Sequence, residues 1–240
     1  MLFEGLLFDL DGTLINFEPE LFIRTYLGAA AQFFIDLIPN PELFYKELLK
    51  STNAMENSDN EKTTALEDFL LDFCPKFNVD CSQISERFLQ FYQTGFNVIQ
   101  PLISQIEGAN ELLQNIKKNL PDTKLILATN PVFPFIAVRK RMEWGNISEA
   151  LFDLITHAEN SHFCKNNKKY WLNIASIMKI EPRNSLVIGN DAYRDLIAKK
   201  YGYKTFLVET TSENEEKITK ETEPDFKGNF SDLNQLLFSD

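Results

Sequence analysis

Cysteine and histidine are scarce in this chain, with three and two among 240 residues. The cysteines, Cys74, Cys81 and Cys164, show no CxxC spacing, and their odd number does not suit a disulfide framework. We therefore expect reduced, buried thiols of the kind found in cytosolic proteins. The histidines, His157 and His162, have no further candidate ligands beside them, which favours ordinary loop residues over a metal site.

Long apolar runs and positive charge are also in short supply. No stretch of eighteen apolar residues occurs, so no transmembrane helix is expected. The N-terminus lacks the basic segment of a secretory signal, so we expect a cytoplasmic protein. Lys and Arg number 24 against 35 Asp and Glu, a formal net charge of −11, which argues against nucleic acid or an anionic membrane as partner. A small anionic ligand remains compatible, because a bound metal ion or a lysine can reverse the local field.

Hydrophobic residues make up 44% of the chain, and in its second half short apolar runs alternate with amphipathic stretches. The near-continuous apolarity of these runs is typical of parallel strands covered on both faces. The expected strands are 6–8, 124–129, 153–156, 185–189 and 204–208, with helices expected at 109–119, 168–179 and 192–200 and a short one at the C-terminus. Strand–helix–strand alternation predicts an α/β fold with a doubly wound parallel sheet.

Residues 17–94 break this alternation, because they contain helical patterns and no convincing strand. The expected helices are 19–37, 41–50, 61–73 and 82–93, separated by turn residues at 39–41 and 57–60. We therefore predict two domains. Residues 1–16 and 95–240 form the sheet domain, and 17–94 form an all-helical insertion.

The stretch "FDLDGT" ends the first expected strand with two aspartates. In open parallel sheets, ligands bind beyond the carboxyl ends of the strands. Asp9 and Asp11 are two positions apart and can converge on one site, while Gly12 permits a tight turn and Thr13 can hydrogen-bond it. Two close carboxylates repel, so they favour a divalent cation or a shared proton.

This stretch resembles the DxDGT motif of the haloacid dehalogenase (HAD) superfamily, and the other motifs of that family follow in order. A threonine ends a hydrophobic strand in "LILATN" (Thr129). A lysine precedes a helix in "FCKNNKKYW" (Lys165), and an acidic loop follows a strand in "VIGNDAYRD". The resemblance covers essentially the whole chain and implies a Rossmann-like core. The helical insertion resembles the C1-type cap of the family's subfamily I phosphatases.

Two positions depart from the family pattern. Asn166 follows Lys165 where the family usually has proline. Asn190 stands between Gly189 and Asp191, where the family usually has Gly-Asp. The resemblance implies a metal ligand in this loop, and we favour Asp191, with Asp195 supporting the loop, while Asn190 is the alternative.

By resemblance, Asp9 is the nucleophile that takes up a phosphoryl group, and Asp11 protonates the leaving alkoxide and later deprotonates water. One Mg²⁺ would be held by Asp9, the backbone carbonyl of Asp11 and the loop after residue 189. Since a halide needs no proton on leaving, Asp11 favours phosphate chemistry over dehalogenation.

The remaining site residues implied by the resemblance bind the phosphate. Thr129 and Asn130 would hydrogen-bond its oxygens, and Lys165 would neutralise charge on the phosphate and on Asp9. These expectations describe a Mg²⁺-dependent phosphatase acting on a small phosphorylated metabolite. A phosphomutase, a dehalogenase and a non-catalytic HAD-like protein that binds phosphate or a partner are the alternatives. The sequence indicates neither the ester nor the oligomeric state.

Overall fold

The computed structural model describes residues 3–16 and 18–239. Its centre is a parallel six-stranded sheet in the order β5-β4-β1-β6-β7-β8. The strands are β1 Gly5–Phe8, β4 Lys124–Leu127, β5 Leu154–Ile155, β6 Ser185–Gly189, β7 Lys204–Val208 and β8 Phe226–Gly228. The strand order reverses on either side of β1, as in a doubly wound fold, so the predicted α/β class is confirmed.

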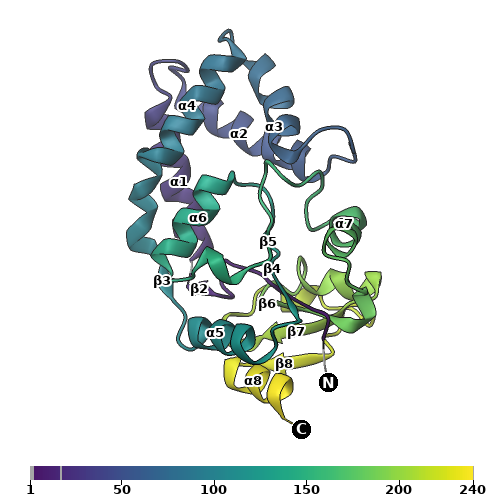
Figure 1. The fold of residues 1–240 in the computed structure, drawn as a ribbon. Coiled ribbons are helices and arrows are strands. Elements are labelled where there is room, and N and C mark those ends of the chain that lie inside the picture. The colour runs from purple at the N-terminus through teal and green to yellow at the C-terminus, as the bar shows by residue number, and fades with distance from the viewer. Residues whose placement is uncertain (1–2, 17, 240) are drawn as a thin grey trace.

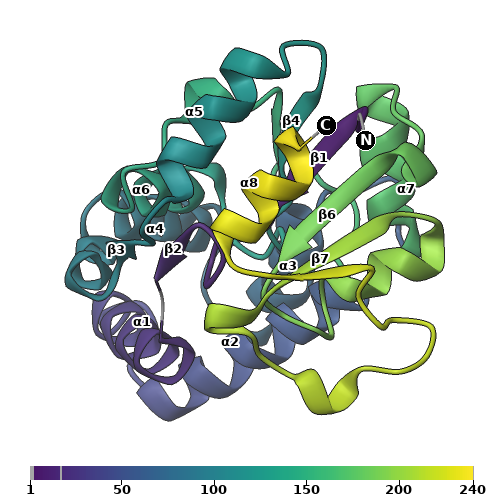
Figure 2. The ribbon, with the colours of Figure 1, turned by 90° about the horizontal axis from the view of Figure 1, so that it is seen from below.

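Helices cover both faces of the sheet. α5 (Ala109–Asn119) and α8 (Phe230–Phe238) lie on one face, and α7 (Lys168–Met178) lies on the other (Figure 2). Side chains along β1 alternate between these layers. Leu6 and Phe8 are buried in the cluster that contains the α5 and α8 side chains, whereas Leu7 is buried with those of α7. This two-sided burial explains why the strands are continuously apolar.

Four further helices stand above the carboxyl ends of the strands (Figure 1). They are α1 Pro19–Phe33, α2 Pro41–Glu56, α3 Ala65–Phe73 and α4 Cys81–Gln93. Their shared interior is rich in aromatic rings: Phe34, Phe44 and Phe73 are fully buried, and the ring centroids of Phe34 and Phe88 lie 4.5 Å apart. This helical insertion is consistent with a cap. Residue 17, its predicted first residue, lies outside the described residues.

Capping residues mark where these helices begin. The Asn40 side chain accepts from Leu43 N at the start of α2, with Pro41 in the first turn. Thr64 and Glu67 form a reciprocal capping box at the start of α3. Such caps satisfy backbone donors that the first turn of a helix leaves unpaired.

A two-stranded antiparallel ribbon, β2 (Ile15–Asn16) with β3 (Ser104–Gln105), lies where the chain leaves for the helical insertion and returns from it. The return runs through the 3₁₀ helix η2 (Gly95–Leu102). Shorter 3₁₀ helices are η1 Cys74–Lys76, η3 Glu149–Leu151, η4 Pro182–Asn184, η6 Glu209–Thr211 and η7 Glu215–Lys217. No helix among the described residues is long and apolar enough to cross a membrane.

Several elements differ from the predicted ones. Helix α6 (Phe135–Trp144) and the edge strand β8 were not predicted. The expected helix 192–200 is a 3₁₀ helix, η5 (Leu196–Tyr201). The third expected strand shortens to the two residues of β5.

The expectation of three reduced thiols was wrong. Cys74 and Cys81 form a disulfide with a Cα–Cα distance of 5.2 Å, and Cys164 is free and buried. The bridge joins the end of α3 to the start of α4 across a turn of a few residues. Because disulfides are typical of oxidising compartments, the cysteine argument for a cytosolic protein does not hold.

Candidate active site

Asp9 and Asp11 follow β1 at the carboxyl end of the sheet, as the sequence predicts. The chain then turns sharply: Gly12 N donates to Ile15 O at 2.8 Å, and Gly12 has φ +79°. A Cβ at Gly12 would also come within 2.9 Å of the Asn190 side-chain carbon Cγ. Both the backbone conformation and the approach of Asn190 therefore require glycine here.

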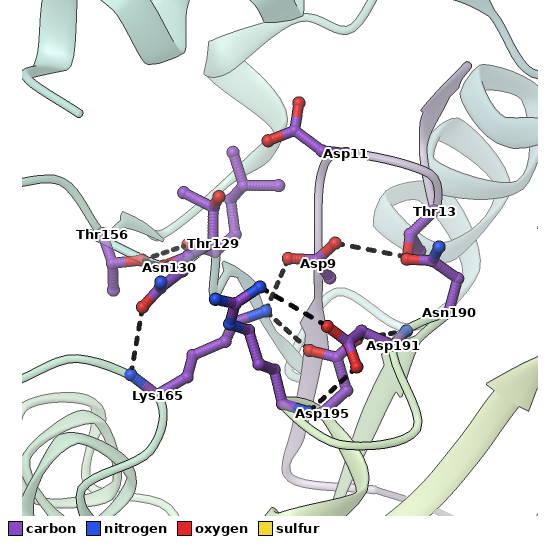
Figure 3. A network of polar contacts seen from close by, with 12 residues as sticks. Asp9, Asp11, Thr13, Thr129, Asn130, Thr156, Lys165, Asn190, Asp191 and Asp195 are labelled. Atoms are coloured by element: carbon purple, nitrogen blue, oxygen red, sulfur yellow. Dashed lines mark hydrogen bonds and ion pairs between the residues drawn. The ribbon is translucent and has the colours of Figure 1, made fainter. Parts of the chain in front are cut away.

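Lys165 lies beneath Asp9 and joins it to Asp195. The ammonium Nζ donates to Asp9 Oδ1 at 2.5 Å and to Asp195 Oδ1 at 2.6 Å (Figure 3), and only 2% of the residue is exposed. Burial disfavours the charged amine, but the Asp195 and Asp9 carboxylates outweigh it and raise the pKa of Lys165. Lys165 therefore remains a cation held against Asp9.

Asp195 is almost fully buried, and its burial raises the pKa of its carboxyl to about 7 even though Lys165 opposes the shift. Its second oxygen, Oδ2, accepts from Asp191 N at 3.0 Å. The carboxylate lies directly against Gly189, where an added Cβ would come within 2.7 Å of the Asp195 Cβ. Asp195 thus braces Lys165 and the start of the loop after β6.

The Asp11 carboxylate points away from Asp9 (Figure 3) and pairs with Arg141 of α6, whose Nη1 donates to Asp11 Oδ2. The Arg141 side chain is 1% exposed, and its guanidinium lies 4.7 Å from the Phe133 ring centroid. Burial raises the pKa of Asp11, and the Arg141 charge only partly opposes this. Sequence reasoning missed Arg141. Its burial beside Ala137 and Val138 is visible only in the structure.

Thr129 and Asn130 follow β4 and face the same space as Asp9 (Figure 3). The carbonyl of Thr129 accepts from Thr156 Oγ1 at 2.8 Å and from the Tyr170 hydroxyl at 3.0 Å, which fixes the backbone at the strand end. Asn130 Oδ1 accepts from Lys165 N at 3.2 Å. These contacts tie the segment after β4 to the segment that carries Lys165.

Glu56, the last residue of α2, contacts the residues that follow β4 and β6, and it was not predicted as a site residue. Its Oε1 accepts from Asn130 Nδ2 at 2.7 Å and lies 3.4 Å from Arg194 Nη2. The helical insertion therefore contacts both the segment after β4 and the loop after β6.

The loop after β6 contains the two candidate ligands, and they have different surroundings. Asn190 is 2% exposed; its Oδ1 accepts from Thr13 Oγ1 at 3.1 Å, and its Nδ2 donates to Thr211 O at 2.8 Å. Thr13 Oγ1 also lies 3.4 Å from Asp9 Oδ2. The side chains of Asn190 and Asp9 therefore both contact the Thr13 hydroxyl.

Asp191 is bound mainly within its own loop. Its Oδ1 accepts from Tyr193 N at 2.9 Å, from Arg194 N at 3.2 Å and from Asn214 Nδ2 at 2.9 Å. Its Oδ2 lies 3.7 Å from Arg194 Nη1. Three donors on one oxygen hold this carboxylate as a turn-stabilising group.

The oxygen atoms that surround Asp9 at the carboxyl ends of the strands suit a hard cation such as Mg²⁺. Asp9, Asp191 and Asn190 offer carboxylate and amide oxygens, the ligands that Mg²⁺ accepts together with water and phosphate. Within residues 3–16 and 18–239, no three His, Cys, Asp or Glu side chains cluster as they would around a metal ion. A magnesium site here would therefore depend on few carboxylates, supplemented by amide or backbone oxygens.

A cavity of about 300 Å³ lies above these residues, between the sheet and helices α1 and α2. The predicted residues Asp9, Asp11, Thr129, Asn130, Lys165, Asn190, Asp191 and Asp195 all line it. The structure therefore brings together every site residue that the sequence predicts.

Comparison with known proteins gives a consistent classification. Residues 3–202 match the family model described as haloacid dehalogenase-like hydrolase. No curated protein matches the chain. Many solved structures share its fold.

Three of these solved structures cover nearly the whole of both chains. A HAD phosphatase from Thermococcus onnurineus has a TM-score of 0.60 at 14% identity, covering 99% of each chain. A dehalogenase with an intermediate complex has a TM-score of 0.58 at 12% identity, covering 99% of this chain and 98% of its own. A protein described as a HAD-hydrolase from Bacillus subtilis, bound to magnesium, has a TM-score of 0.58 at 18% identity, covering 99% of each chain. At these identities the likeness establishes the fold alone.

Proposed function

The chain belongs to the haloacid dehalogenase-like hydrolase family, and we propose that it is a Mg²⁺-dependent phosphatase that cleaves a small phosphate monoester through an aspartyl-phosphate on Asp9. The observation that carries this proposal is the pair Asp9 and Asp11 on the floor of one cavity, with Lys165 Nζ 2.5 Å from Asp9 Oδ1. The HAD phosphatase and the magnesium-bound hydrolase of the same fold are consistent with it.

In the first step, an oxygen of Asp9 attacks phosphorus and the bond to the ester oxygen breaks. Asp11 donates a proton to that departing oxygen. Its ion pair with Arg141 favours the carboxylate, whereas burial raises the pKa of Asp11 and favours the protonated form that this step needs once the pair is broken. Asp11 must turn from Arg141 towards the cavity to do so. A halide leaving group would need no such acid, which is why Asp11 favours a phosphatase over a dehalogenase.

In the second step, Asp11 takes a proton from water, and the water oxygen attacks phosphorus and releases Asp9. Lys165 and Thr129 hold the phosphoryl oxygens, and the raised pKa of Lys165 keeps it charged throughout. Asn130 keeps the backbone of Lys165 in place through its hydrogen bond to Lys165 N.

A Mg²⁺ ion bound beside Asp9 would reduce the repulsion between the carboxylate nucleophile and the dianionic phosphate. Asp9 and the Asp11 backbone carbonyl would hold it from one side. For the ligand from the loop after β6, the contacts favour Asn190 Oδ1, because Asn190 shares Thr13 with Asp9. Asp191 is held away by three donors to its Oδ1, and its Oδ2 faces Arg194 Nη1 at 3.7 Å.

The test is hydrolysis of p-nitrophenyl phosphate with and without Mg²⁺. We expect Asp9→Asn to abolish turnover, and EDTA to silence the wild-type protein until Mg²⁺ is restored. Asp36→Asn is the matched control, because Asp36 lies on the helical insertion with its side chain 61% exposed, and it should retain full activity. Metal-dependent turnover in folded Asp9→Asn protein would exclude Asp9 as the nucleophile.

A further inference from the structure

The cavity above Asp9 has a polar floor and an apolar roof. Its floor consists of the site residues described above. Its roof is formed by α1 and α2, which contribute chiefly Phe22, Ile23, Leu27, Leu48 and Leu49. A phosphate on the floor would therefore place its ester group against aliphatic and aromatic side chains.

Among the described residues, those that α1 and α2 contribute to this roof include no cationic side chain that could bind a charged leaving group. Among the described residues that line the cavity, the only cationic side chains are Lys165 and Arg194. Lys165 is bound to Asp9 and Asp195, and Arg194 lies near Glu56 and Asp191. Apart from Lys165, a carboxylate or a second phosphate on the substrate would meet only the Arg194 guanidinium, which already faces the carboxylates of Glu56 and Asp191.

The polar side chains of the roof already have partners. The Tyr26 hydroxyl lies 2.9 Å from the Tyr92 hydroxyl, and Thr52 Oγ1 donates to Leu48 O at 2.9 Å within its own helix. Glu56 accepts from Asn130. A substrate rich in hydroxyls would therefore gain few hydrogen bonds from this roof, and hydroxyls placed against its apolar side chains would lose hydrogen bonds to water.

A second cavity of about 250 Å³ adjoins the first and is lined mainly by side chains of α2, α3 and α4. The two share the side chains of Tyr26, Leu48, Thr52 and Val132 as a common wall. The second is lined mainly by Met55, Leu66, Phe69, Leu70, Phe88 and Ile136, and its carboxylates, Glu86 and Glu159, belong to exposed residues. Apolar side chains thus line both the roof above the phosphate position and the neighbouring cavity inside the helical insertion.

We propose that the substrates of this site are phosphate monoesters with an apolar leaving group, whose hydrocarbon body lies between α1 and α2 and extends towards the second cavity. This inference rests on the proposed phosphatase function and adds the substrate class. The free energy gained by burying each methylene group should raise kcat/KM by about threefold to fourfold. The gain enters mainly through KM, because the apolar contacts are the same in the ground state and the transition state.

The test is a series of n-alkyl phosphates from ethyl to hexyl, compared with glucose 6-phosphate and phosphoglycolate, all with Mg²⁺. We expect kcat/KM to climb by about threefold to fourfold per methylene, with hexyl phosphate at least tenfold better than either polar ester. A flat series, or a polar ester that is the better substrate, would overturn the inference. If p-nitrophenyl phosphate is still hydrolysed in that case, the phosphatase function stands.

If no ester is hydrolysed, the proposed function fails, and calorimetric titration with the same alkyl phosphates decides the binding question. Affinity that rises with chain length would support the apolar site. Affinity independent of length would refute it.

A pair of leucine variants assigns the effect to the cavity. Leu49 on α2 is 52% exposed and lines the first cavity, whereas Leu71 on α3 is 65% exposed and lines neither. We expect Leu49→Lys to reduce the hexyl-to-ethyl ratio of kcat/KM about fivefold through KM, and Leu71→Lys to leave that ratio at the wild-type value. An unchanged ratio in Leu49→Lys, or an equal fall in both variants, would contradict the proposal.

Discussion

Breaking the ion pair between Arg141 and Asp11 should be one of the more destabilising single changes in this protein. Arg141→Met is the informative change, because methionine keeps an apolar stem next to Phe133 but removes the charge. The Asp11 carboxylate would then lose the partner of Oδ2, and its Oδ1 already has no hydrogen-bond partner. The variant therefore leaves a poorly solvated carboxylate without a counter-ion.

The geometry sets the size of the loss. Two opposite charges about 4 Å apart attract by about 4 kcal/mol at an effective dielectric constant of about 20. Removing one partner of a buried pair costs about 3–5 kcal/mol. Because the Asp11 side chain is 21% exposed whereas that of Arg141 is 1% exposed, water can recover part of the loss at Asp11. We therefore expect a decrease of about 3 kcal/mol in the free energy of unfolding, near the lower end of that range.

Urea denaturation of wild type, Arg141→Met, Asp11→Asn and the double variant measures both the loss and the coupling between the two residues. A loss of about 3 kcal/mol corresponds to a Tm lower by about 6–12 °C for a chain of this length. Lys200→Met is the control: its ion pair with Glu221 is exposed, with side-chain exposures of 38% and 74%, and should be worth less than about 1 kcal/mol. The reasoning is refuted if Arg141→Met destabilises the protein no more than this control.

Two other changes test the packing and the charges elsewhere. Gly189→Ala should lower the free energy of unfolding, measured by urea denaturation, by about 1–3 kcal/mol, because its Cβ would displace Asp195. Gly28→Ala is the control and should cause no loss, since a Cβ there meets no atom within 4 Å. If the two variants are equally stable, Asp195 does not pack closely against Gly189. Burial alone would raise the pKa of Asp225, but contacts that include Lys199 hold this pKa below its ordinary value. The ionised Asp225 therefore stabilises the fold when the pH is above that ordinary pKa, and this stabilisation is lost as the pH falls. Asp225→Asn should therefore be less stable than wild type at pH 6, with the gap closing below about pH 4; a gap independent of pH would contradict this.

The strands and the position of the site could be predicted because their signals are local. A buried strand covered on both faces must be apolar throughout, so β1, β4, β6 and β7 are visible in the sequence. Polar residues directly after such strands lie at one edge of a parallel sheet. The sheet itself therefore brings Asp9, Thr129 and Asn190 to one cavity.

Arg141 could not be predicted, because its burial depends on a partner 130 residues away. Taken alone, "VRKRMEW" has the charge density of an exposed helix, and α6 was not predicted either. The Cys74–Cys81 disulfide was not predicted for a related reason. The seven-residue separation of these cysteines becomes bridgeable only because α3 and α4 pack with these two residues 5.2 Å apart at Cα.

Asn190 and Asp191 are adjacent in the sequence, so the order of the motifs does not decide which of them would bind a metal ion. Charge alone favours Asp191, because a carboxylate binds a divalent cation more strongly than an amide does. The structure adds a steric relation that the sequence does not display: Gly12 is bare on the side where Asn190 packs, and Thr13 lies between Asn190 and Asp9. Asn190 therefore packs closely against the turn after β1, whereas Asp191 forms its hydrogen bonds mainly within its own loop. That complementarity, rather than formal charge, is why we propose Asn190 over Asp191 as the residue of this loop that would bind a cation.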